Sequence, residues 1–136
     1  GFSSAAKWYV EGVSKRSGIE VNLHIPREMK RLPDALELVL FRILQECLTN
    51  IHRHANCKSA LVQIDLGADE IALQIRDDGQ GMPPELLERF KTSGAGIGVG
   101  LNSMRERISE LNGHFEIQSG KNGTLVRAAI PLAAAF

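Results

Sequence analysis

The sequence predicts an α/β (α+β) fold, a two-layer sandwich in which helices cover one face of a mixed, mostly antiparallel sheet. Three features of the chain favour this class. Several short segments alternate apolar and polar residues, as half-buried strands do. Others repeat apolar residues every three or four positions, as helices do, and the two kinds of segment are interleaved. The 136 residues suit one domain with one core, and we expect residues 1–4 and 133–136 to be tails.

The first helix is expected over residues 5–17, ending before Gly18. Its apolar anchors are Trp8, Tyr9 and Val13. A strand follows at residues 21–25, where Val, Leu and Ile alternate with polar residues, and Pro26 closes it.

The second helix opens at Pro33 and Asp34, and Glu37 makes with Asp34 a pair like that of a capping box. We expect this helix to run to about His54. Its apolar residues share one face, which predicts a buried side: Leu36, Val39, Leu40, Ile43, Leu44, Cys47, Leu48 and Ile51.

The second half of the chain predicts two hairpins and a helix. Strands over Ala60–Leu66 and Ile71–Asp77 are joined by four residues. A short segment from Pro83 ends in a glycine-rich run, and a helix over Leu101–Leu111 follows. The last hairpin turns at residues 121–123 and ends in a strand over residues 125–130.

Composition argues against several classes of protein. Sixteen basic and sixteen acidic residues cancel, so nothing indicates a surface for nucleic acid or for direct membrane contact. No apolar run approaches the roughly 20 residues of a membrane span. Cys47 and Cys57 form no C-x-x-C pair, so we expect reduced structural thiols in a cytoplasmic protein. Because the chain begins at Gly1, we expect a fragment, whose parent is either soluble or membrane-anchored.

The run from Asp77 to Met82 holds the first candidate site. A carboxylate at a strand end can accept a hydrogen bond from an exocyclic amine. Gly79 and Gly81 lack a Cβ, so a flat ring can approach the backbone there. An ordinary turn is the alternative interpretation, because Asp and Gly are also common turn residues.

The second helix carries a polar face. Glu46, Asn50 and Arg53 follow the spacing i, i+4, i+7, and Asn50 points toward the buried side. One interpretation is an amide bonded to neighbouring backbone. The other is an oxygen ligand for a hard cation such as Mg²⁺, with Glu46 facing the same ligand.

Two further motifs are ambiguous by themselves. Gly98 and Gly100 precede a helix, whose free N–H groups and dipole favour an anion, although a flexible linker has the same composition. Thr124, after Gly123, offers a hydroxyl near Asp77, although a hairpin residue is the simpler interpretation.

In this order, the motifs resemble the catalytic, ATP-binding domain of sensor histidine kinases, within the GHKL ATPase superfamily and its Bergerat fold. The run Gly100-Leu101-Asn102-Ser103-Met104-Arg105-Glu106-Arg107, followed by Leu111-Asn112-Gly113, is similar to that of NarX/DesK-type kinases. The resemblance covers nearly the whole chain. Its motifs are Glu46-x-x-x-Asn50, Arg53-His54-Ala55, Asp77-x-Gly79-x-Gly81, Gly98-x-Gly100-Leu101 and Gly123-Thr124.

The resemblance implies ATP and Mg²⁺ as cofactors and gives a role to each motif. Asn50 would bind Mg²⁺, Arg53 would neutralise phosphate charge, and His54 would lie near phosphate. Glu46 would be the catalytic residue that orients or deprotonates the attacking group.

The resemblance also assigns the base and the phosphates to the remaining motifs. Asp77 would accept from the adenine amine, with Thr124 assisting through a water. Gly79 and Gly81 would let the chain pass the purine. The other nucleotide-binding residues implied are Met82, Gly98, Gly100 and Leu101.

The implied reaction moves the γ-phosphate of ATP to a histidine on a separate dimerisation domain of the same parent protein, and then to a response regulator. Two departures from the family pattern stand out. The segment between Gly81 and Gly96 is short, and none of the four histidines is followed by Asp or Glu, so the phosphoacceptor is missing. An anti-sigma-factor serine kinase and a nucleotide-gated interaction module on the same fold are the alternatives.

Overall fold

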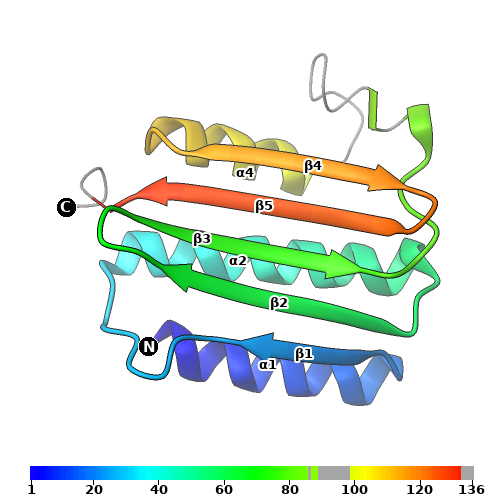
Figure 1. Cartoon of the computed structure of the whole chain (residues 1–136), viewed down its shortest axis with the longest axis horizontal. Coiled ribbons are helices and arrows are strands. Elements are labelled where there is room, and N and C mark those ends of the chain that lie inside the picture. The colour runs from blue at the N-terminus through cyan, green and yellow to red at the C-terminus, as the bar shows by residue number, and fades with distance from the viewer. Residues whose placement is uncertain (86, 89–98, 133–136) are drawn as a thin grey trace.

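A five-stranded sheet organises the part of the chain that the computed structural model describes, which is residues 1–85, 87–88 and 99–132. Its order is β1-β2-β3-β5-β4 (Figure 1). The strands are β1 (Glu20–His24), β2 (Ser59–Leu66), β3 (Glu70–Asp77), β4 (His114–Gly120) and β5 (Gly123–Pro131). β1 pairs with β2 in parallel, and the other pairs are antiparallel, so the predicted mixed, mostly antiparallel sheet is confirmed.

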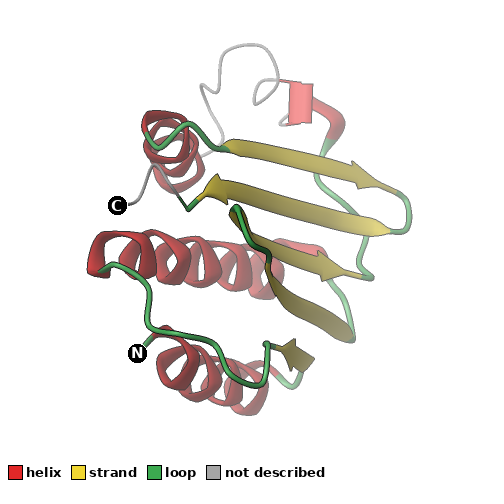
Figure 2. Ribbon diagram, turned by 60° about the vertical axis from the view of Figure 1, so that its left-hand side comes forward, coloured by secondary structure: helices red, strands yellow, loops and turns green. Residues whose placement is uncertain are grey.

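Within the described part of the chain, three long α-helices lie on one face of this sheet (Figures 1 and 2). They are α1 (Phe2–Ser17), α2 (Asp34–Asn50) and α4 (Val99–Glu110), and α2 lies between the other two. The predicted two-layer arrangement is therefore confirmed. None of the helices among the described residues is long and apolar enough to cross a membrane.

The core lies between α2 and the middle of the sheet. Leu40, Ile43 and Leu44 of α2 are fully buried, as predicted from their spacing. Ile71 and Leu73 of β3 belong to the same cluster. The opposite face of the sheet is largely polar. This pattern suits an antiparallel sheet with one covered face and one exposed face.

The N-terminus differs from the prediction. α1 begins at Phe2, so residues 2–4 are helical rather than a tail, and the Phe2 side chain is only 3% exposed. Trp8 was expected to anchor the helix, but it is 75% exposed. The apolar stripe of α1 includes Phe2, Ala6, Val10 and Val13, and Trp8 lies off that stripe. The predicted tail at 133–136 lies outside the described residues.

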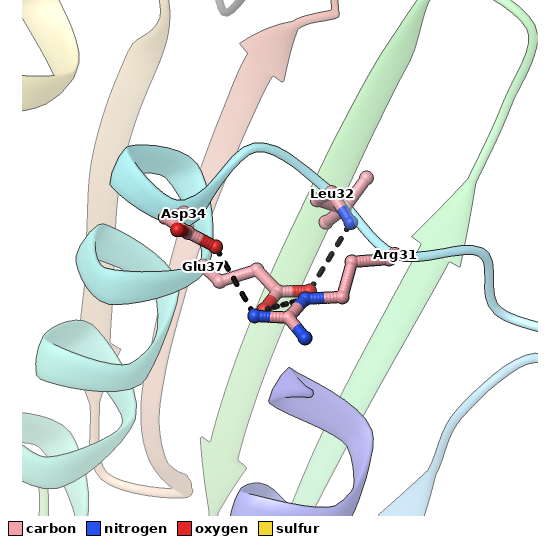
Figure 3. A network of polar contacts seen from close by, with 4 residues as sticks. All are labelled: Arg31, Leu32, Asp34 and Glu37. Atoms are coloured by element: carbon pink, nitrogen blue, oxygen red, sulfur yellow. Dashed lines mark hydrogen bonds and ion pairs between the residues drawn. The ribbon is translucent and has the colours of Figure 1, made fainter.

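The start of α2 is held by a polar network rather than by the predicted capping box (Figure 3). Glu37 accepts a hydrogen bond from the Leu32 backbone N–H at 3.1 Å, and its other carboxylate oxygen lies 3.4 Å from Arg31 Nε. Asp34 pairs with the same guanidinium at 3.1 Å. The N-cap position belongs to Pro33, which has no side-chain oxygen, so Glu37 reaches the loop before it instead.

The end of α2 also differs from a uniform helix. The α-helix stops at Asn50, and a single π-helical turn, η1 (Ile51–Ala55), continues it to Asn56, which has a φ of 50°. A π-turn inserts an extra residue into the helical repeat, and such turns are frequent at functional sites. The hydrophobic spacing predicted that the helix would reach His54, but it gave no sign of the wider turn.

Candidate functional site

A cavity of about 560 Å³ opens where η1, the end of β3 and the start of β5 meet. Figure 1 shows these ends together at one side of the sandwich. The volume suits a small-molecule ligand. The apolar lining includes Ile51, Ile75, Ile117, Val126 and Met82. The polar lining includes Asn50, Arg53, His54, Asp77, Gln80 and Thr124.

Asp77 is the one charged or polar residue in the buried class among the described residues, at 5% exposure. It is the last residue of β3 and pairs with Ala60, so strand alternation turns its side chain toward the helices. Its Oδ1 accepts from the backbone N–H of Gly79 at 2.9 Å and, more weakly, from that of Thr124 at 3.4 Å. Burial raises the pKa of Asp77, although these two hydrogen bonds act in the opposite direction.

Asp78, the next carboxylate, has the opposite environment. It is exposed, and it ties the end of β3 to the start of β2. Its Oδ1 accepts from the N–H groups of Lys58 and Ser59, both at 3.2 Å, and its Oδ2 accepts from Ser59 Oγ at 3.0 Å. The hydrogen bonds from Ser59 lower the pKa of Asp78. The two adjacent acids therefore have different roles, one at the cavity and one in the sheet.

The two glycines of the D-x-G-x-G run are required by the protein's own backbone. A Cβ at Gly79 would lie 2.1 Å from Ala55 O, and Gly79 is not among the cavity-lining residues. Gly81 does line the cavity; its φ is +82°, and a Cβ there would lie 2.2 Å from Gly120 O. Close backbone packing against η1 and the β4–β5 hairpin thus explains both glycines in the structure without any ring.

Gln80 fixes the loop after β3 onto the π-turn. Its backbone N–H donates to Ala55 O at 2.9 Å, and its side-chain amide donates to His54 O at 2.8 Å. The side chains of Arg53 and His54 are exposed and reach the cavity lining from this turn. The π-turn therefore contributes two exposed basic residues to a cavity whose lining also includes apolar side chains.

Ser119 ties the same loop to the β4–β5 hairpin. Its Oγ accepts from the Met82 N–H at 2.6 Å and lies 2.8 Å from Thr124 Oγ1, across the β4–β5 pair. Gly123 packs so closely on β3 that a Cβ there would lie 2.0 Å from Asp77 O. The hairpin, the loop and the buried acid therefore form one fixed unit.

Asn50 reaches the cavity lining, and Glu46 does not. Both residues are half-buried on α2, one turn apart. No group of three or more His, Cys, Asp or Glu side chains that could hold a metal occurs among the described residues. A single amide oxygen beside a ligand's own phosphates fits Mg²⁺, which binds proteins through one or two side chains and keeps several waters.

The glycine-rich run is only partly described. Gly98 lies outside the described residues, whereas Gly100 and Leu101 belong to the first turn of α4, which begins at Val99. The helix therefore starts two residues earlier than predicted.

Sequence reasoning missed Gln80 and Ser119 as residues that hold the loop beside the cavity, and it missed Asp78 as the residue that ties the end of β3 to the start of β2. Ser119 had a usable signal, since a two-residue turn at Lys121 and Asn122 pairs Gly120 with Gly123 and therefore Ser119 with Thr124. Gln80 and Asp78 had none, because their partners lie far away along the chain, at His54 and Ala55 for Gln80 and at Lys58 and Ser59 for Asp78.

Comparison with known proteins gives the family to which this fold and its cavity belong. Residues 35–134 match the family of histidine kinase-, DNA gyrase B-, and HSP90-like ATPases, and the chain belongs to that family. The chain is 31% identical over 135 residues to the oxygen sensor histidine kinase NreB of Staphylococcus carnosus. The aligned region covers 97% of this chain and 37% of NreB. The chain is 30% identical over 133 residues to the histidine-protein kinase/phosphatase DegS of Brevibacillus brevis, covering 97% of this chain and 33% of DegS.

A solved structure supports the same fold. The histidine kinase domain of the blue-light activated histidine kinase from Erythrobacter litoralis EL346 superimposes with a TM-score of 0.78 at 21% identity, covering 97% of this chain and 61% of that one. The predicted resemblance to the histidine kinase ATPase domain is therefore confirmed. The chain spans about a third of the length of the curated relatives named above.

The buried acid makes a prediction about stability. Because burial raises the pKa of Asp77, the folded state holds a proton more tightly than the unfolded state does. The free energy of unfolding therefore falls as pH rises from the unfolded pKa, about 3.9, through the folded pKa, and it stays lower above that. The side chain of Asp77→Asn cannot ionise. We therefore expect the free energy of unfolding of this variant to match that of the parent at about pH 3 and to exceed it at about pH 7. Urea unfolding at both pH values measures the difference.

Asp78→Asn is the matched control, and its sign is opposite. Because the pKa of Asp78 is lower in the folded state than in the unfolded state, its ionised carboxylate stabilises the fold at pH values above the pKa of the unfolded state. That contribution is lost as the pH falls through the pKa of the folded state. This variant should be less stable than the parent near neutral pH and approach it in acid. A loss of stability in both variants at neutral pH would contradict the environment described for Asp77.

Proposed function

We propose that this chain is the ATP-binding catalytic domain of a two-component sensor histidine kinase. It would transfer the γ-phosphate of Mg·ATP to a histidine on a separate dimerisation domain of its parent protein, from which a response regulator would receive it. Membership of the ATPase family supports the use of ATP. The observation that carries the proposal is the buried carboxylate of Asp77 in the wall of the cavity.

The base end of the ligand is proposed to lie against Asp77. Both backbone donors to this carboxylate use Oδ1. Oδ2 is then the acceptor proposed for the exocyclic amine of adenine, and the apolar wall that includes Ile75 and Val126 would cover the faces of the ring. Thr124 would assist beside it, through its hydroxyl or a water. Gly81 and Met82 would complete this end of the cavity.

The phosphate end is proposed to lie toward η1. Arg53 would offset phosphate charge there, His54 would lie near phosphate, and Asn50 would hold Mg²⁺ through its amide oxygen. Bound Mg²⁺ would supply charge neutralisation at the phosphates. Gly98, Gly100 and Leu101 would contribute at the start of α4, where the helix dipole favours an anion.

Glu46 is proposed as the catalytic residue that takes a proton from the acceptor histidine or orients that side chain. A histidine nucleophile needs a neutral nitrogen, and a carboxylate that accepts the other ring proton favours attack. Glu46 lies one turn before Asn50 on α2, outside the cavity lining. That position suits contact with an incoming domain better than contact with the nucleotide. We further propose that the domain works in the cytoplasm, where its parent would find ATP.

Calorimetric titration with Mg·ATP tests the binding half of this proposal. We expect micromolar-range affinity for the parent chain and a loss of at least about tenfold in Asp77→Asn, equivalent to about 1.4 kcal/mol for one lost charge-assisted hydrogen bond. Asp78→Asn, which removes the neighbouring acid outside the cavity lining, should keep the parent affinity at a temperature below its unfolding transition. Equal affinities for all three proteins would falsify the adenine assignment.

Phosphotransfer to the dimerisation domain, supplied as a separate protein, tests the catalytic half of the proposal. This domain is expected to be a helical hairpin that carries the acceptor histidine. The hairpin comes from the parent gene or a relative, and transfer is followed by radiolabel from γ-labelled ATP. We expect Glu46→Gln to slow transfer about 100-fold, the lower range for general base catalysis, while nucleotide affinity stays at the parent value. Glu116→Gln, on the exposed face of β4, is the control and should transfer at the parent rate. Tight nucleotide binding with no transfer by the parent would favour an interaction module instead.

A further inference from the structure

We propose that Gln80 is a positioning residue for the phosphate end of the cavity. It would hold the last carbonyl groups of η1 and thereby keep Arg53 and His54 beside the phosphates of a ligand. The inference rests on the proposed function, because it assumes that the phosphates extend toward η1. It gives a residue of the loop after β3, which follows the base-binding acid, a part in phosphate binding.

Two neighbouring carbonyl groups at the end of η1 are bonded by this one residue. The last carbonyl groups of a helix have no partner within the helix. Here the Gln80 backbone N–H donates to Ala55 O at 2.9 Å, and Gln80 Nε2 donates to His54 O at 2.8 Å. A carbonyl oxygen can only accept, so the amide must present its nitrogen to His54. An ionised carboxylate, which can only accept, could not take this place.

The basic side chains of η1 depend on the backbone of the turn for their placement. Arg53 and His54 are exposed and belong to the cavity lining. In the part of the chain that the structure describes, neither side chain makes a hydrogen bond or an ion pair. No contact of that kind would therefore keep them beside a ligand if the turn shifted. The two bonds from Gln80 join the end of the turn to the loop after β3, so they limit such a shift.

The base end of the cavity is held by other contacts. Asp77 Oδ1 accepts from the backbone N–H groups of Gly79 and Thr124, and Ser119 Oγ accepts from the Met82 N–H. None of these bonds uses the Gln80 side chain. Removal of that side chain should therefore weaken the contribution of the phosphates to binding and leave the contribution of the base unchanged.

The ratio of the adenosine to the ADP dissociation constant measures the contribution of the phosphates. Calorimetry without Mg²⁺ leaves the phosphate charge to the protein's own side chains. In Gln80→Ala we expect this ratio to fall about threefold, the lower range for one hydrogen bond, because the contact is exposed. The adenosine affinity should stay at the parent value. An unchanged ratio, or an equal loss of affinity for both ligands, would overturn the proposal.

Two further variants bracket this result. Gln80→Glu keeps the shape of the side chain but cannot donate, and it adds a negative charge close to the phosphates. The ratio should therefore fall at least as far as in Gln80→Ala, and a parent ratio in Gln80→Glu would contradict the role of the donor. Gln118→Ala, on the exposed face of β4, is the control and should keep the parent ratio.

A double-mutant cycle shows whether Gln80 acts through η1 or contacts the ligand itself, since Gln80 also belongs to the cavity lining. The Arg53→Ala/His54→Ala background lacks the side chains that Gln80 is proposed to position. Adding Gln80→Ala to this background should leave the ratio of dissociation constants unchanged. If Gln80 bonded the phosphates directly, its removal would lower the ratio by the same factor in both backgrounds, and the proposal would be overturned.

A measurement on the unaltered chain keeps the proposal testable if a variant does not fold. The side-chain amide resonance of Gln80, followed by NMR, should shift more on addition of ADP than on addition of adenosine, because the phosphates act on the turn that this amide holds. Equal shifts with the two ligands would overturn the inference while leaving nucleotide binding intact. No binding of either ligand by the parent chain would instead overturn the proposed function, and this inference with it.

Discussion

The burial of one carboxylate is the constraint on which the site depends. Asp77 ends β3 on the inner face of the sheet, where alternation would ordinarily place an apolar side chain. An ionised acid there is costly unless it is hydrogen-bonded. The chain supplies two backbone donors to one of its oxygens and packs Gly123 directly against its backbone. The raised pKa of Asp77 shows that these contacts offset the cost of burial only in part. A group held at the expense of stability is typical of a binding site.

The surrounding structure divides into a fixed end and a charged end. Around Asp77, contacts between β3, the following loop and the β4–β5 hairpin leave no room for a Cβ at Gly81 or Gly123. This end can recognise a rigid ring, because its polar atoms are positioned before a ligand arrives. The other end is the π-turn, whose Arg53 and His54 are exposed at the rim. The guanidinium of Arg53 suits a phosphate group, because its fixed set of N–H donors can bind two phosphate oxygens at once. Gln80 couples the two ends, since it bonds the loop after Asp77 to the backbone of the turn.

Much of this arrangement could be predicted from the sequence, and the exceptions have physical causes. Alternation placed Asp77 at a strand end, and helical spacing brought Asn50 to the buried side of α2; the structure puts both in the cavity lining. Local patterns could not reveal the π-turn, because an inserted residue leaves the hydrophobic spacing before it unchanged. They also misjudged Phe2 and Trp8, since two large apolar residues near a chain end do not indicate which of them faces the core. Gly79 is a different case: the residue was correctly singled out, but its lack of a Cβ is needed by Ala55 of η1.

The central claim is that Asp77 accepts a hydrogen bond from the amino group of a purine bound in this cavity. A crystal structure of the chain grown with Mg·ADP tests it most directly. The account predicts the exocyclic nitrogen of adenine within about 3 Å of Asp77 Oδ2, with the diphosphate extending toward Asn50 and Arg53. A nucleotide bound at another surface, or a base in the cavity whose amine faces away from Asp77, would contradict the account.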